Sequence, residues 1–141
     1  MADIKWHGDA FEKKLFAHVK RNLAAACIAL VNHAKTLISI EGTGKVRERD
    51  SRGKFKRTKL IYNANPSSPG EPPHVQTGRL RGSVAFEVLT LGSMIGRVGT
   101  NLKYGRWLEL GTKKMAARPW LRRSLLELKA AIAAIICRPM P

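Results

Sequence analysis

The chain has 141 residues, of which 44% are hydrophobic, and its 26 Lys and Arg residues against 10 Asp and Glu give a formal net charge of +16. This length predicts one domain with a single core, and the hydrophobic content is ordinary for a globular protein. The charge excess predicts an anionic neighbour, either nucleic acid or an acidic protein surface.

The sequence contains no residue set typical of catalysis, a cofactor site or a metal site. Its cysteines and histidines lack ligand spacing, and its few acidic residues leave little for paired carboxylates or a Mg²⁺ site. We therefore expect no enzyme, no cofactor and no metal. Cys27 and Cys137 each lie among apolar residues and are expected to be reduced and packed. No stretch predicts a signal peptide or a membrane span.

Residues 9–40 are predicted to form one long amphipathic helix. Apolar residues recur every three or four positions, at Phe11, Leu15, Val19, Leu23, Cys27, Leu30, Ala34 and Leu37. Such a helix would be about 45 Å long at the standard rise, more than a small domain needs. Part of it is therefore expected to pack on another subunit. The alternative is a break near Asn32 and His33, because long uninterrupted helices are a minority.

Residues 41–62 form a basic segment that we term the basic tongue and expect to close as a hairpin. Its cations are Lys45, Arg47, Arg49, Arg52, Lys54, Lys56, Arg57 and Lys59. One interpretation is that the basic tongue contacts DNA or an acidic partner. The other is a solvated loop, which is what charge runs usually are.

Residues 63–76 are rich in Pro, Ser and Asn and predict an extended connector. Residues 77–141 then predict a sheet followed by two helices. Apolar alternation from Val84 to Leu89 indicates a strand, and 94–98 returns as the second strand of a hairpin. A short helix is expected over 104–110 and a closing helix over 119–136. The predicted fold is α+β: a long N-terminal helix, a small antiparallel β-sheet, a short helix and a C-terminal helix packed on the sheet.

Two blocks of the sequence resemble a known family. Tyr104-Gly-Arg-Trp-Leu-Glu-Leu-Gly-Thr112 is followed by Met115-Ala-Ala-Arg-Pro-Trp-Leu121, and upstream stands Thr77-Gly-Arg-Leu-Arg-Gly-Ser83. Their order and spacing resemble the head–tail joining, or tail-completion, proteins of lambda-like tailed phages. The resemblance covers about residues 66–125. Ala116 stands where the family favours Pro, and Trp120 stands where it favours Phe.

The resemblance implies a structural virion protein of the phage neck or tail end, assembled in the host cytoplasm. It implies a homo-oligomeric ring, with six-fold symmetry as the expectation. The ring would join or complete the tail, with tail-terminator, tail-tube and head-connector proteins as partners, incidental contact with DNA and no membrane. The alternative function is a nucleic-acid-binding module that uses residues 45–59, although no helix-turn-helix, RNP-type strand or zinc framework accompanies the charge.

Candidate interface residues come from side chains that protein interfaces favour. The aromatic ones are Tyr104, Trp107 and Trp120, and the arginines are Arg79, Arg81 and Arg118. For both tryptophans, core packing is the alternative, because large aromatic side chains dominate small cores. Glu109 completes the set, and we expect it to pair with Arg79 or Arg118 within one subunit or between subunits.

Overall fold

The computed structural model describes residues 8–42, 67–75, 77–91 and 93–140, and the cations of the basic tongue, at 45–59, lie outside these residues. The elements in chain order are α1 (Gly8–Ser39), α2 (Arg79–Ser83), β1 (Val84–Leu91), β2 (Ser93–Thr100), α3 (Lys103–Leu110) and α4 (Leu121–Ile136). The predicted α+β class is confirmed, with a long N-terminal helix, a two-stranded antiparallel sheet, a short helix and a C-terminal helix.

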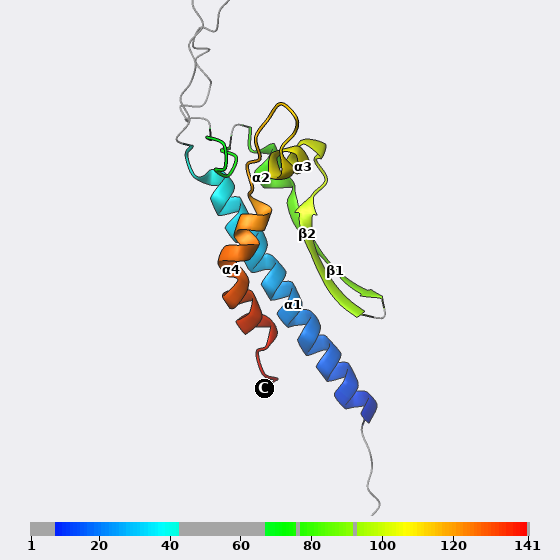
Figure 1. Cartoon of the computed structure of the whole chain (residues 1–141). Helices are drawn as coiled ribbons and strands as arrows, with labels where there is room; N and C mark the ends of the chain where they lie inside the picture. Colours follow the sequence, from blue (N-terminus) through cyan, green and yellow to red (C-terminus); the bar gives the residue numbers. More distant parts are fainter. Residues whose placement is uncertain (1–7, 43–66, 76, 92, 141) are drawn as a thin grey trace, which may run out of the picture.

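Helix α1 is the element on which the others pack. It runs unbroken for 32 residues, so the alternative of a break near Asn32 is wrong. Figure 1 shows the hairpin along one side of α1 and α4 along another, with the first turns of α1 extending past the hairpin turn. The principal contacts of α4 are with α1. The prediction that the C-terminal helix packs on the sheet is therefore wrong, because α1 already covers the inner face of this narrow hairpin.

The hairpin packs closely on α1 because β2 contains a glycine at the contact. Strands β1 and β2 pair from Val84 opposite Thr100 to Leu91 opposite Ser93. A Cβ atom on Gly96 would lie 2.6 Å from Cys27 Sγ and 3.1 Å from a Leu23 methyl group. Only a residue without a side chain allows this approach, so Gly96 sets the distance between the hairpin and α1.

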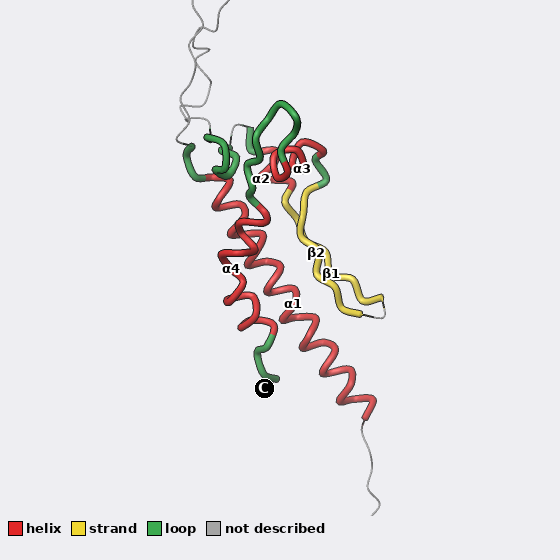
Figure 2. Tube along the Cα trace, viewed as in Figure 1, coloured by secondary structure: helices red, strands yellow, loops and turns green. Residues whose placement is uncertain are grey.

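The core lies at the C-terminal half of α1, where α2, β1 and the start of α4 converge on the helix. Its buried members are Val31, Ala34, Ile38, Leu80, Val84 and Trp120. Helix α2 was not predicted, and it brings Leu80 into this core. Figure 2 shows that α2, α3 and most described loops gather at this end of the molecule. The core therefore sits directly beneath the loops that carry the candidate site residues.

A second contact fixes the other end of α4. His18 and Asn22 are buried on α1, and both side chains lie within hydrogen-bond distance of the Arg138 carbonyl, at 2.9 and 3.1 Å.

The two cysteines differ in burial. Cys27 is buried, which raises the pKa of its thiol by desolvation. Cys137 is exposed, so the prediction that it is packed is wrong. It directly follows the last residue of α4, as the C-cap of the helix.

Candidate functional site

The loop between α3 and α4 folds back over α3 because of a glycine. Gly111 has φ 76°, and its N–H donates to the Trp107 carbonyl at 2.8 Å. A Cβ atom there would lie 2.8 Å from the Ala117 nitrogen. Thr112 and Met115 then exchange backbone hydrogen bonds across a tight turn. The left-handed conformation and the lack of space both require glycine at this position.

Glu109 fixes the start of α4. Its Oε2 atom accepts hydrogen bonds from the backbone N–H groups of Trp120 and Leu121 at 2.8 and 2.9 Å, and Oε1 accepts one from Arg122 at 2.8 Å. The first N–H groups of a helix have no partner within the helix, and the N-terminal end favours negative charge. The carboxylate of α3 therefore caps α4 and holds the two helices together.

The predicted pairing of Glu109 with an arginine of its own subunit is wrong for the described residues, whereas pairing between subunits stays a prediction. The ion pairs of these residues converge on Glu127, and neither Arg79 nor Arg118 pairs with Glu109. The carboxylate is already satisfied by three amides of its own chain. Its charge therefore supports the fold and leaves the nearby arginines unneutralised.

Those arginines surround a pocket of about 380 Å³, which we term the arginine pocket. Its polar lining comprises Ser67, Thr77, Arg79, Arg81, Arg118 and Tyr104, together with His74. Helix α2 supplies two of the arginines, α3 supplies the tyrosine, and the loop before α4 supplies Arg118. Of the four predicted interface residues that line it, three are cationic, and none of the described lining residues is a carboxylate.

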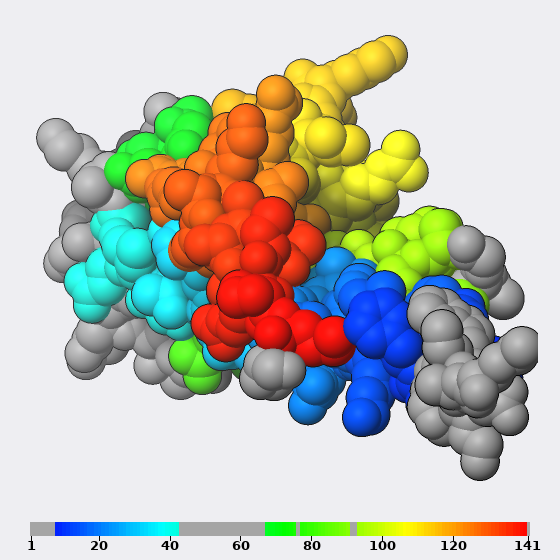
Figure 3. All heavy atoms as spheres, turned by 90° about the horizontal axis from the view of Figure 1, so that it is seen from below, coloured from blue at the N-terminus to red at the C-terminus, as the bar shows by residue number. Residues whose placement is uncertain are grey.

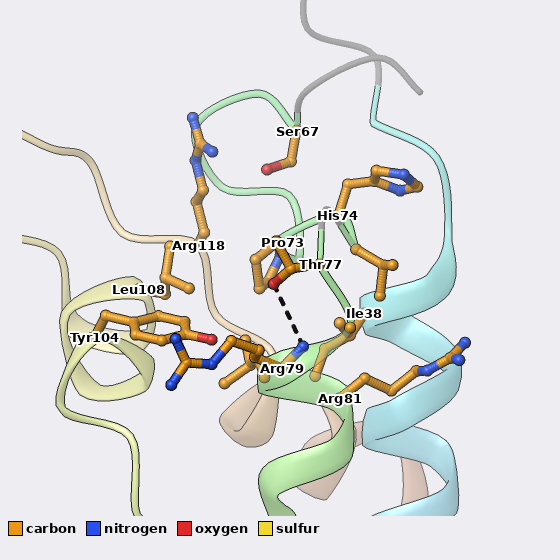
Figure 4. A pocket seen from close by; sticks show the side chains of 13 residues that line it. Ile38, Ser67, Pro73, His74, Thr77, Arg79, Arg81, Tyr104, Leu108 and Arg118 are labelled. Carbon is orange, nitrogen blue, oxygen red and sulfur yellow. Dashed lines mark hydrogen bonds between the residues drawn. The ribbon is translucent and has the colours of Figure 1, made fainter. Parts of the chain in front are cut away.

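Figure 4 shows how these side chains lie. Arg79 runs beside the Tyr104 ring, and Arg81 turns toward α1, where its Nη1 donates to Ser39 Oγ at 3.3 Å. The Ser67 hydroxyl points toward the wall of the pocket that carries the Arg118 side chain. The cations thus occupy different parts of the rim.

Two backbone hydrogen bonds hold the connector as a wall of the arginine pocket. The Val75 N–H donates to the Ile38 carbonyl at the end of α1 at 2.9 Å. The Gly70 N–H donates to the Ala117 carbonyl, next to Arg118, at 3.0 Å. The described part of the predicted extended connector therefore bridges α1 and the α3–α4 loop.

The remaining predicted site residues lie elsewhere. Trp120 is 2% exposed and belongs to the core, as its alternative interpretation held. Trp107 is 54% exposed on α3, so core packing is wrong for this residue. Ser67 and Thr77 were not predicted. Both lie in irregular segments rich in turn residues, where no periodicity indicates which side chain faces a pocket.

A second surface feature is an apolar groove over α1, between α4 and the hairpin. Its volume is about 480 Å³, and its apolar lining includes Leu23, Leu30, Val98, Leu125, Ile132 and Ile136. Figure 3 shows the first turns of α1 (blue) emerging between the end of α4 (red) and the hairpin (yellow-green). A further hollow of about 400 Å³ lies between Phe16 and Met94. Sequence periodicity predicted the stripe on α1 but not which part of it would stay uncovered.

Comparison with known proteins assigns no function to the arginine pocket or to the apolar groove. No protein-family model, curated protein or solved structure matches the chain. Within the described ranges, no group of three or more His, Cys, Asp and Glu side chains could hold a metal ion. None of the helices in the described part is long and apolar enough to cross a membrane.

Proposed function

We propose that this chain is a structural virion protein of the neck or tail end of a tailed phage. It assembles as a homo-oligomeric ring and joins or completes the tail at the head–tail interface, without enzymatic activity. The observation that supports assembly most is the amount of apolar surface left uncovered along α1 and α4.

The first turns of α1 carry a set of exposed apolar side chains, which we term the N-terminal apolar face. Its members Phe11, Leu15, Phe16 and Val19 are 57, 41, 53 and 38% exposed. Monomeric proteins rarely expose contiguous apolar patches of large size, and those that do generally use them for interaction. This face continues the stripe that farther along α1 forms the core. It is therefore suited to pack on a second protein surface.

The apolar groove is the surface of this chain that best complements that face. It is concave and apolar, and the N-terminal apolar face is convex and rich in aromatic residues. If the face of one copy occupies the groove of the next, the contact is head-to-tail, and such contacts close into rings when the rotation closes. The hairpin offers a further surface for contacts between copies. In the described part its sheet has two strands, and each has an unpaired edge.

The family resemblance supports the same function. The residues that carry it form the centre of the domain: Glu109 caps α4, Trp120 fills the core, and Arg79 and Arg118 line the arginine pocket. Tail-terminator, tail-tube and head-connector proteins are the expected partners on the faces of the ring. The net charge of +16 gives nucleic-acid binding as the second candidate function.

Complementation of phage particles tests the proposed function. Purified protein is added to heads and tails from infected cells in which this gene is inactivated, and the particles are immunolabelled for electron microscopy. We expect infectivity to be restored and the label to lie at the neck. Label on free DNA, with no label on joined particles, would support the nucleic-acid-binding alternative and contradict a role in joining.

A further inference from the structure

The arginine pocket has the composition of an anion-binding site. Among the described residues, three guanidinium groups and no carboxylate line it, and none of the three forms an ion pair. Arginine presents donors in a planar fork that matches carboxylate and phosphate groups. The pocket is therefore suited to an anion supplied from outside the chain.

Two buried donors in the pocket have no acceptor. Ser67 is only 4% exposed, and its Oγ atom has no hydrogen-bond partner among the described residues. The Nε atom of Arg118 is likewise buried without a partner. Buried polar atoms in folded proteins nearly always have partners. Because the Ser67 hydroxyl points to the wall that carries Arg118 (Figure 4), one acceptor group could serve both.

The apolar part of the lining indicates which kind of anion fits. Ile38, Pro73, Leu80 and Leu108 line the pocket together with the arginines. An aliphatic chain ending in a carboxylate matches a lining that combines apolar side chains with cations. The phosphates of a DNA duplex lie on a convex and polar backbone that has nothing apolar to place on these residues. The lining thus favours a peptide carboxylate over a nucleic-acid phosphate.

We propose that the arginine pocket binds a glutamate or aspartate side chain within a partly apolar, acidic segment of a partner protein. This inference deepens the proposed joining function and rests on it for the identity of the partner. The pocket lies at the end of the molecule that holds the α1 C-terminus, whereas the N-terminal apolar face lies at the other end (Figure 1). Partner docking and ring contacts are therefore separable by mutation.

Fluorescence anisotropy with defined probes tests this proposal. One probe is a labelled, end-blocked peptide of alternating leucine and glutamate; a second replaces each glutamate with glutamine; the third is a short labelled DNA duplex. We expect the glutamate peptide to bind at least about tenfold more tightly than the glutamine peptide, and its affinity to fall with salt. Equal binding of the two peptides would overturn the proposal.

Point variants test whether the glutamate peptide binds at the arginine pocket. R118Q should weaken glutamate-peptide binding about tenfold, S67A should weaken it severalfold without a large change in shape, and R97Q, on the hairpin, should leave it unchanged. Thermal melts check that each variant is folded, and S67A remains informative if R118Q is not. Pocket variants should keep the wild-type oligomeric mass, so failure here is distinguishable from failure of ring assembly. If R118Q and S67A weakened only duplex binding, the pocket would be a phosphate site and the proposal would be wrong.

Discussion

Glu109 shows how one charged side chain can serve the fold in a chain with a large cationic excess. Its carboxylate accepts three backbone hydrogen bonds at the start of α4, and Trp120, which donates one of them, lies in the centre of the core. A single acidic residue therefore connects α3, α4 and the core. Glu109 therefore does not neutralise the nearby arginines.

Replacing this carboxylate should destabilise the protein. E109A leaves the first N–H groups of α4 without their acceptor, and we expect a loss of about 2 kcal/mol in the free energy of unfolding. Denaturant unfolding monitored by circular dichroism measures it. E127A is the comparison variant, because Glu127 is an exposed acidic residue of α4 that pairs with Arg123 and with His33 but caps no helix, and exposed pairs are worth about 0.2–1 kcal/mol.

The alternative explanation for a loss in E109A is a broken ion pair. Changing Arg79 or Arg118 to glutamine in the E109A background should restore no stability, because neither arginine pairs with Glu109. Restoration by either change, or equal losses in E109A and E127A, would contradict the capping role.

At the scale of elements, the contact between the hairpin and α1 depends on one glycine. G96A places a Cβ atom within 2.6 Å of Cys27 Sγ, so the strand or the helix must shift. Overpacking of this kind costs about 1–3 kcal/mol, which unfolding measurements can detect. G99A is the matched control on the same strand, since a Cβ atom there meets nothing within 4 Å.

A double mutant separates overpacking from loss of strand flexibility. C27A removes the sulfur atom that the new Cβ atom would meet, so G96A should cost less in the C27A background than in the wild type. Identical costs in both backgrounds would show that the thiol is not the limiting contact. A cost of G99A equal to that of G96A would also contradict this explanation.

Helices and strands were predictable from the sequence wherever apolar residues recur at the spacing of one face of the element. The helical spacing from Phe11 to Leu37 and the alternation from Val84 to Leu89 follow directly from helix and strand geometry. The predictions that were wrong depend on contacts between residues that are distant in the sequence. The partner of Glu109 could not be predicted, because the sequence does not distinguish an arginine side chain from the amides of a later helix as its donor.

The same reason explains the errors and omissions at the site. Four predicted interface residues do line one pocket, but Ser67 and the short α2 helix lie in turn-rich segments without periodicity. Cys137 was expected to be packed because its neighbours are apolar, yet the helix ends there and the side chain is exposed. The position of α4 depended on which apolar surface remained free, and that is a property of the whole fold.

At the scale of the whole molecule, the surface combines a strongly cationic character with apolar areas that one copy does not cover. Phe11 is 57% exposed at one end of α1, and Leu126 is 65% exposed on α4. Copies with like charge repel one another, so the proposed assembly requires apolar burial that outweighs this repulsion. In this proposal the apolar areas form the ring contacts, and the cationic pocket binds an acidic segment of a partner.

Oligomeric mass tests the central claim, which is assembly through the N-terminal apolar face. Native mass spectrometry of the purified protein over a range of concentrations should give one discrete oligomer. The double variant F11K/L15K places charge on this face and should be a folded monomer, whereas A10K/A25K, which adds the same charge at exposed alanines of α1, should keep the oligomer. A wild-type protein that is monomeric at every concentration, or an oligomer that persists in F11K/L15K, would contradict the account.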